Sequence, residues 1–258
     1  MISELIITVF FLFSCSKITS TKITTQNTTL PTKQSLISVE KEKVIELIIN
    51  LKNNLAKQEN YYTNTSGIVS TFAFVTTHKQ KVESTIIKNG QLLFKESIST
   101  SSLKQVAEQM IIDEGTCYIR SAKKISSSVT WNNEFETKDF NTYLDEYGTN
   151  PYEFTGYEID LKSITWYSIS DNKIELKLDP LESTKKYAKE IKRMANSNDY
   201  PKFSLIEITI LYNKDYLIEK VIIHEIYELD FPVFGSLSCT NNMDIKYFYE
   251  KKEINDFR

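Results

Sequence analysis

The sequence predicts an α+β protein in which a mostly antiparallel sheet packs on an N-terminal helix and on one helix inserted late in the chain. Two observations predict this class. Most of the chain between residues 67 and 252 alternates apolar and polar side chains with a period of two, which is typical of strands. Residues 39–59 and a segment beginning at Asp179 instead carry apolar side chains at helical spacing.

The chain opens with a short apolar segment that leads to a cysteine. Residues 5–13 are apolar at every position except Thr8, which is too short a run to span a bilayer and suits a signal peptide. Leu12, Ser14 and Cys15 resemble the lipobox of bacterial lipoproteins, in which an apolar residue and then a small residue precede the cysteine. The resemblance implies cleavage after Ser14, a diacylglyceryl group on Cys15 and an extracytoplasmic protein anchored to the bacterial cell membrane. The alternative is a buried N-terminal strand or helix.

The predicted organisation is a signal peptide over residues 1–14, a lipidated cysteine with a flexible tether over residues 15–38, and one α+β domain over residues 39–258. The tether is expected because residues 16–38 are rich in Ser, Thr, Lys, Gln and Asn and have little periodicity. The chain has 258 residues, of which 41% are hydrophobic, enough for a sizeable core.

The first body element is a predicted helix over residues 39–59. Its apolar stripe consists of Val44, Ile48, Leu51 and Leu55, spaced by four, three and four. One such stripe on a charged helix indicates a face that packs on a larger element.

A series of hairpins should follow. Asn89-Gly90 and Glu114-Gly115 are turn signals, the first being the strongest short hairpin signal. The flanking predicted strands cover residues 68–77, 82–88, 91–98, 109–113 and 116–121.

Residues 126–156 lack regular periodicity but are rich in large aromatic side chains. A short helix is predicted within residues 138–147. One interpretation is a satellite core, and the other is a lid over an apolar cavity. The candidate lid residues are Trp131, Tyr143, Tyr147 and Tyr152.

Alternation returns over residues 157–168 and 173–179, separated by a turn at Asp171-Asn172. In the second strand Ile174, Leu176 and Leu178 should share one face. Asp179 then serves as the N-cap of a helix, with Pro180 at its first position. The expected buried stripe of this helix consists of Leu181, Thr184, Ala188, Ile191 and Ala195.

The closing segment predicts a long hairpin and a last strand, over residues 203–212, 216–229 and 242–252. Ile206, Ile208 and Ile210 should share one face of its first arm. Met243 should lie on the inner face of the last strand.

This order of elements resembles the LolA/LppX-type group of bacterial lipoproteins. The resemblance covers roughly residues 39–252 and implies a strongly curved, incompletely closed sheet, a half-barrel, that wraps around helices and leaves an apolar cavity for acyl chains. The residues that could line such a cavity are Ile174, Leu176, Ile206, Ile208, Ile210 and Met243.

Signals for chemistry are sparse. The net charge of −3 and the absence of a long basic run argue against a nucleic-acid partner, and none is expected. No zinc-site spacing or catalytic motif is found, so neither a metal nor another cofactor is expected, and the protein should not be an enzyme. His224 and the facing carboxylates Glu207 and Glu225 are weighed as catalytic groups, but sheet positions explain them more simply. Cys117 and Cys239 either form a disulfide or remain separate buried thiols.

The sequence therefore predicts a non-enzymatic membrane-anchored protein that binds a lipid or another hydrophobic ligand. The alternatives are an interaction module or adhesin with a solid core, and, less simply, a hydrolase. A contiguous apolar cavity beneath the sheet would favour ligand binding over the interaction module.

Overall fold

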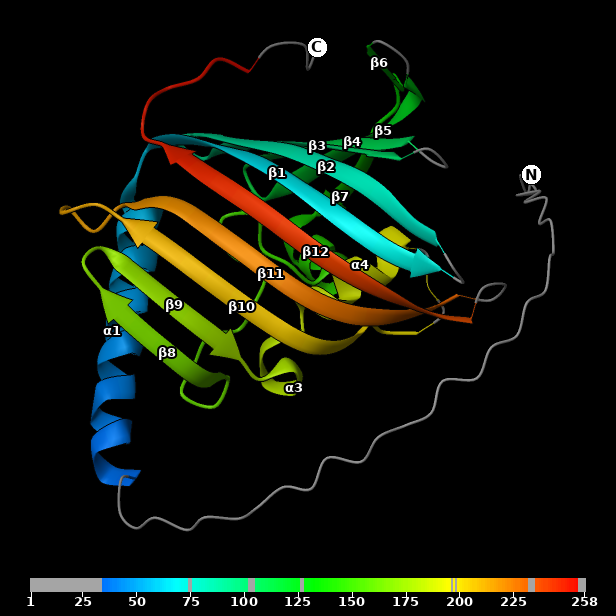
Figure 1. Cartoon of the computed structure of the whole chain (residues 1–258). Coiled ribbons are helices and arrows are strands. Elements are labelled where there is room, and N and C mark those ends of the chain that lie inside the picture. The colour runs from blue at the N-terminus through cyan, green and yellow to red at the C-terminus, as the bar shows by residue number, and fades with distance from the viewer. Residues whose placement is uncertain are drawn as a thin grey trace, which may run out of the picture.

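A computed structural model describes residues 34–73, 76–101, 105–125, 128–195, 197, 199–231 and 235–254. Within these residues, twelve strands form one sheet that is curved and unclosed, and helices lie against its inner face (Figure 1). The predicted α+β half-barrel is confirmed. The predicted signal peptide, Cys15 and most of the predicted tether lie outside the described residues.

The sheet consists of two antiparallel meanders. The first meander contains β1 (Asn60–Ala73), β2 (Thr76–Asn89), β3 (Leu92–Ser101), β4 (Gln105–Asp113) and β5 (Thr116–Ile125), and the short strands β6 (Val129–Trp131) and β7 (Glu136–Asp139) both pair with β5. The second meander contains β8 (Ile164–Ser170), β9 (Lys173–Leu178), β10 (Lys202–Tyr212), β11 (Ile218–Phe231) and β12 (Gly235–Phe248). The meanders join where β1 pairs with β12, so the first and last long strands are neighbours in the centre of the sheet.

The turn signals account for the hairpins of the first meander. Glu114 and Gly115 form the turn between β4 and β5, with φ values of 45° and 79°, the left-handed conformation that a tight hairpin requires at both positions. The predicted Asn89-Gly90 hairpin is also present, but Asn89 belongs to β2 and the two-residue turn consists of Gly90 and Gln91. The expected single strand over residues 68–77 is wrong, because β1 ends at Ala73 and β2 begins at Thr76. No Gly, Pro or Asn in that stretch marks the reversal.

Helix α1 (Gln34–Lys57) lies on the inner face of the second meander. Val44, Ile48, Leu51 and Leu55 are at most 3% exposed, so the predicted stripe is confirmed. Full burial of one such side chain contributes about 2 kcal/mol. The helix begins at Gln34, and the last five residues of the predicted tether therefore belong to it.

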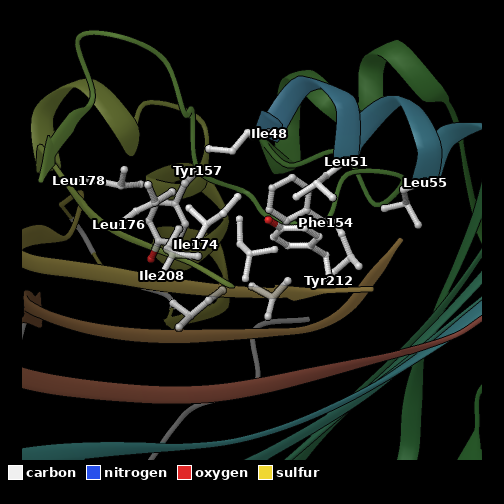
Figure 2. Close-up of a cluster of buried hydrophobic side chains, with 14 of the residues drawn as sticks. Ile48, Leu51, Leu55, Phe154, Tyr157, Ile174, Leu176, Leu178, Ile208 and Tyr212 are labelled. Atoms are coloured by element: carbon white, nitrogen blue, oxygen red, sulfur yellow. The ribbon is translucent and has the colours of Figure 1, made fainter. Parts of the chain in front are cut away.

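The main core lies between α1 and strands β9, β10 and β11. Figure 2 shows Phe154 and Tyr157, from the irregular segment before β8, packed between the helix and the strands. Both side chains are 2% exposed. The predicted inward faces of β9 and β10 are confirmed. Their buried residues are Ile174, Leu176, Leu178, Ile206, Ile208, Ile210 and Tyr212.

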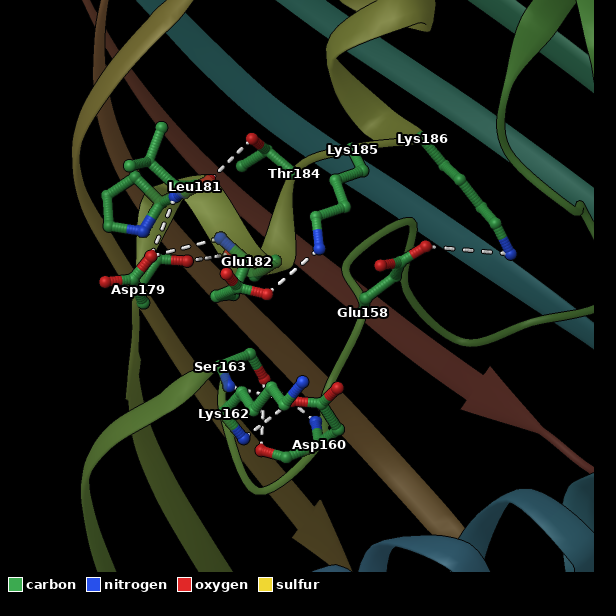
Figure 3. A network of polar contacts seen from close by, with 12 residues as sticks. Glu158, Asp160, Lys162, Ser163, Asp179, Leu181, Glu182, Thr184, Lys185 and Lys186 are labelled. Carbon is green, nitrogen blue, oxygen red and sulfur yellow. Dashed lines mark hydrogen bonds and ion pairs between the residues drawn. The ribbon is translucent and has the colours of Figure 1, made fainter.

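The expected strand over residues 157–168 is wrong over its first half, because β8 begins only at Ile164. Before it, Asp160 forms a tight turn in which its Oδ1 accepts hydrogen bonds from the backbone N–H groups of Lys162, at 2.8 Å, and Ser163, at 2.7 Å (Figure 3). These bonds lower the pKa of the Asp160 carboxyl because they stabilise its charged form. An aspartate that bonds its own backbone in this way competes with strand pairing.

The late helix is two helices, α3 (Pro180–Ser183) and α4 (Tyr187–Ala195). Asp179 caps α3 as predicted, accepting hydrogen bonds from the backbone N–H groups of Leu181 and Glu182 (Figure 3). The hydroxyl of Thr184 then donates to the Pro180 carbonyl, at 2.6 Å, and such bonds weaken a helix interior. Because the predicted helix is divided in two, its apolar stripe is not continuous. Leu181 in α3 is 82% exposed, whereas Thr184, Ala188 and Ile191 are buried as expected.

Helix α2 (Phe140–Tyr147) lies within the predicted residues 138–147. Asp139 caps its first turn, and Gly148 ends it in the left-handed conformation, with φ 87°. A Cβ atom on Gly148 would lie 2.3 Å from the backbone oxygen of Lys186, so the end of α2 packs directly against the start of α4. Among the described residues, none of the helices combines the length and hydropathy that a membrane span requires.

Candidate ligand-binding pocket

One cross-strand row on the inner face of the first meander is apolar except for a single lysine. Register places Tyr61 opposite Lys88, Lys88 opposite Leu93, Leu93 opposite Ile112, and Ile112 opposite Cys117. Residues paired in this way point to the same side of the sheet. The four neighbours of Lys88 in the row are at most 3% exposed. The row therefore brings one ammonium group into an apolar strip.

A pocket of about 500 Å³ opens over this row, between the end of α1, two hairpin turns and the start of α2. Ligand pockets for small molecules have volumes of roughly 300 to 1,000 Å³. The lining residues are Leu55, Ala56, Tyr61, Lys88, Gly90, Gln91, Ile112, Glu114, Gly115, Phe140 and Tyr152. The walls are mostly apolar, and Lys88 and Glu114 are their charged members.

Aromatic contacts fix one wall of the pocket. The rings of Phe140 and Tyr152 meet edge to face with centroids 5.9 Å apart, and the hydroxyl of Tyr152 donates a hydrogen bond of 3.2 Å to the Gln91 carbonyl. Burial raises the pKa of Tyr61 to about 12, and it also raises the pKa of Tyr152. Both phenols are therefore neutral at physiological pH, and Lys88 and Glu114 carry the charge of the lining.

Lys88 is held at the C-terminal end of α1. Its Nζ donates hydrogen bonds to the carbonyls of Ala56, at 3.2 Å, and Gln58, at 2.5 Å, and lies 5.7 Å from the centroid of the Tyr61 ring. Burial lowers the pKa of the ammonium, and the nearby negative charge of Glu59 partly opposes this change. The position is favourable for a cation because the carbonyl end of a helix carries partial negative charge.

A second pocket, of about 1,000 Å³, has mainly polar walls and lies beside β5, β6 and the end of α4. Two aromatic side chains of this pocket contact Arg120. Its guanidinium lies 5.7 Å from the centroid of the Trp131 ring and 5.0 Å from that of the Phe135 ring. Arg193, also in the lining, lies 3.9 Å from the Tyr147 ring and forms an ion pair with Glu108 at 3.3 Å. This pocket is unsuited to an acyl chain because polar groups dominate its walls.

The four candidate lid residues fall in three places. Tyr143 and Tyr147 stack with ring centroids 4.4 Å apart and are buried in a cluster with Leu93 and Met110. Such a cluster is what the satellite-core interpretation predicts for these two residues. Tyr152 lines the first pocket, whereas Trp131 lines the second, where Tyr147 also contributes. The structure does not bring the four together over one cavity.

The six predicted cavity residues do lie together, but in the packed core. Ile174, Leu176, Ile206, Ile208 and Ile210 are at most 1% exposed, and Met243 packs against the same cluster. None of them lines either pocket, because α1 together with Phe154 and Tyr157 fills the space in front of them (Figure 2). The predicted location of the cavity is therefore wrong.

Cys117 and Cys239 are free and buried, which corrects the possible disulfide in favour of separate thiols. Cys117 lies in β5 and Cys239 in β12, and the strand order places four strands between them. A disulfide needs Cα atoms within about 7 Å, and neighbouring strands alone are about 4.8 Å apart.

The facing carboxylates Glu207 and Glu225 do not form a catalytic pair. Register places Glu207 opposite His224 and Glu225 opposite Ile206, so the two carboxylates point to opposite faces of the sheet. Glu207 forms an ion pair with Lys177, and His224 Nδ1 lies 2.7 Å from Asn242 Oδ1. Among the described residues, no group of three or more His, Cys, Asp or Glu side chains could hold a metal ion.

Glu225 is instead a fully buried polar group of the core. Its Oε1 accepts hydrogen bonds from Asn241 Nδ2, at 2.7 Å, and from the Tyr187 hydroxyl, at 3.3 Å. Its Oε2 and the Asn241 Oδ1 are both buried without a partner. Burial raises the pKa of Glu225 to about 7, although the Asn241 bond acts in the opposite direction.

Sequence reasoning missed the pocket itself. Tyr61, Lys88 and Ile112 come from three different strands and are adjacent only through the register of those strands. The one available signal was Lys88, a charged residue in phase with Ile86 on the inward side of a predicted strand.

No protein-family model matches the sequence, and no curated protein matches it significantly. Among solved structures, LprF from Mycobacterium bovis is similar with a TM-score of 0.38 and 9% identity, covering 83% of this chain and 95% of LprF. A DUF1329 family protein from Desulfovibrio piger is similar with a TM-score of 0.26 and 12% identity, covering 83% of this chain and 93% of the other. At these TM-scores neither likeness carries a function over to this chain.

Proposed function

We propose that this protein is a non-enzymatic binding protein for a single hydrophobic ligand, such as an acyl chain, held in the pocket over Tyr61, Lys88 and Ile112. The observation that carries this proposal is the pocket of about 500 Å³ with mostly apolar walls. Burial of apolar ligand surface in such a pocket contributes roughly 25 cal/mol per Å². The pocket meets the size expected for ligand binding, although it lies beneath the other half of the sheet from the one predicted.

We further propose that the protein acts outside the cytoplasm on a lipid anchor. The support is the sequence of residues 5–15, with Leu12, Ser14 and Cys15 in the lipobox pattern. A tether after Cys15 would let the ligand-binding domain work near a membrane, which is a source of acyl chains. Intact mass measurement of protein extracted from membranes tests this part. The expected mass is that of the chain from Cys15 plus diacylglycerol, and an unprocessed soluble chain contradicts it.

The binding of a neutral fluorophore tests the pocket. N-phenylnaphthylamine should gain fluorescence with the wild-type protein. Ala56→Trp should weaken its binding by about tenfold or more, because the indole would occupy the pocket and a loss of about 1.4 kcal/mol suffices for that factor. Asn53→Trp is the matched control, since Asn53 is exposed on the same helix and does not line the pocket.

Two results would refute ligand binding in this pocket. One is the absence of any fluorescence gain with the wild-type protein. The other is equal binding by the wild-type protein and by a folded Ala56→Trp variant. Either result would favour the interaction module, for which the packed core beneath β9 and β10 is the supporting observation.

A further inference from the structure

The charge inside the pocket is asymmetric. Lys88 lies within the apolar row, whereas Glu114 lies exposed on the turn between β4 and β5. An exposed charge is screened by water and salt, and a partly buried one much less. The pocket therefore presents a positive charge on its floor and a weak negative charge at its rim.

The ammonium of Lys88 has donor capacity left. A lysine ammonium carries three N–H donors, and the carbonyls of Ala56 and Gln58 take two of them. Among the described residues, no carboxylate forms an ion pair with Lys88. A partly buried charge without an ion-pair partner is costly, and the two carbonyl dipoles together with the exposed carboxylate of Glu59 compensate it only in part.

We propose that the ligand of this pocket is an anionic amphiphile of the fatty-acid class, with its carboxylate bound to Lys88 Nζ. The inference rests on the proposed function and names the ligand class of the same site. The ligand carboxylate forms the ion pair that Lys88 lacks among the described residues, and it accepts a hydrogen bond from the remaining N–H group. The acyl chain lies against the apolar lining residues, namely Leu55, Ile112, Phe140 and Tyr152.

Other head groups fit this arrangement less well. A neutral alcohol leaves the ammonium charge uncompensated. An amine would place a second positive charge next to the Lys88 ammonium, and two like charges in contact repel each other. The neutral phenols of Tyr61 and Tyr152 do not oppose a carboxylate. Glu59, whose charge acts on Lys88, Asp113, whose charge acts on Tyr152, and Glu114, which lines the pocket, are all exposed.

Displacement of N-phenylnaphthylamine by three ligands with the same chain tests the inference, namely laurate, lauryl alcohol and laurylamine. With the wild-type protein, laurate should compete about tenfold or more better than the alcohol, because its carboxylate forms a charge-assisted hydrogen bond with Lys88 that the neutral hydroxyl group cannot match. The amine should be the weakest competitor. Lys88→Met should remove the advantage of laurate and leave the alcohol within about twofold of its wild-type affinity.

The control is Lys57→Met, which removes an exposed lysine in the last turn of α1 that does not line the pocket. This variant should keep the preference for laurate. If the acid and the alcohol compete equally with the wild-type protein, the inference fails while the proposed function stands. If the neutral fluorophore itself does not bind, the proposed function fails as well. The comparison on the wild-type protein decides the question even where Lys88→Met does not fold.

Discussion

Replacing Glu225 by glutamine should stabilise the protein at pH 8 and leave its stability nearly unchanged at pH 4. The folded pKa of this carboxyl is about 7, against 4.5 for the unconstrained group, because burial disfavours its charged form. The unfolded chain loses the proton near pH 4.5, but the folded chain retains it until about pH 7. The contribution of Glu225 to stability is thus fully present below pH 4.5 and is lost as the pH rises to about 7.

The magnitude follows from the shift. A change of one unit corresponds to 1.36 kcal/mol, so a rise from 4.5 to about 7 amounts to about 3 kcal/mol. Glutamine has no proton to lose and keeps an oxygen acceptor for Asn241 and Tyr187. The expected gain over wild type at pH 8 is therefore about 3 kcal/mol.

Urea denaturation of both proteins between pH 4 and pH 8 measures this difference. The buried groups Tyr187, Tyr227 and Cys239 stay neutral over this range because the pKa of each is raised. Glu207→Gln is the control, since Glu207 is partly exposed on the opposite face and should change stability by less than about 1 kcal/mol. A stability difference between Glu225→Gln and wild type that is the same at pH 4 and pH 8 would refute the reasoning.

Three further predictions concern the core, the helix junction and the thiols. Leu51→Ala should lower the free energy of unfolding by about 2 to 5 kcal/mol because it leaves a cavity between α1 and the sheet, whereas Ile49→Ala, at a residue 50% exposed, should cost less than about 1 kcal/mol in the same urea titration. Gly148→Ala should lower the thermal midpoint, because its left-handed backbone disfavours a Cβ by about 1 to 2 kcal/mol and the Lys186 carbonyl occupies the space; a midpoint equal to wild type would contradict the packing of α2 on α4. Cys117 and Cys239 should both react with a thiol reagent only after denaturation, since both are buried and burial raises the pKa of each, that of Cys117 to about 11; rapid labelling of the native protein would contradict this.

The sequence allowed the strands and helices to be predicted where one periodicity decides the structure. Ile174, Leu176 and Leu178 alternate strictly, and all three face the core. Asp179 and Pro180 mark a helix start that the structure contains. Leu181 was misplaced because the helix breaks near Thr184, where a side-chain hydroxyl bonds the backbone.

The pocket could not be predicted because it depends on relations between distant segments. Phe154, in a stretch without periodicity, and Tyr157, in a stretch expected to be a strand, fill the space that the expected cavity would have occupied. The actual pocket depends on the register of β1, β2, β3 and β4, which a single strand does not reveal. The alternation within β2 places Lys88 on the inward face of the sheet. That this face is apolar around Lys88 follows only from Tyr61 and Leu93, which lie opposite Lys88 on the two neighbouring strands.

The pairing of β1 with β12 has a consequence for how the chain acquires its structure. Tyr62 lies opposite Phe248, so the two strands at the centre of the sheet come from segments that are far apart in the sequence. Such distant pairing slows folding, because a large loop must close before any of its contacts form. One edge of β1 has no partner until β12 has paired with it. A chain truncated before Gly235 would keep that edge bare, and strand edges of this kind promote aggregation.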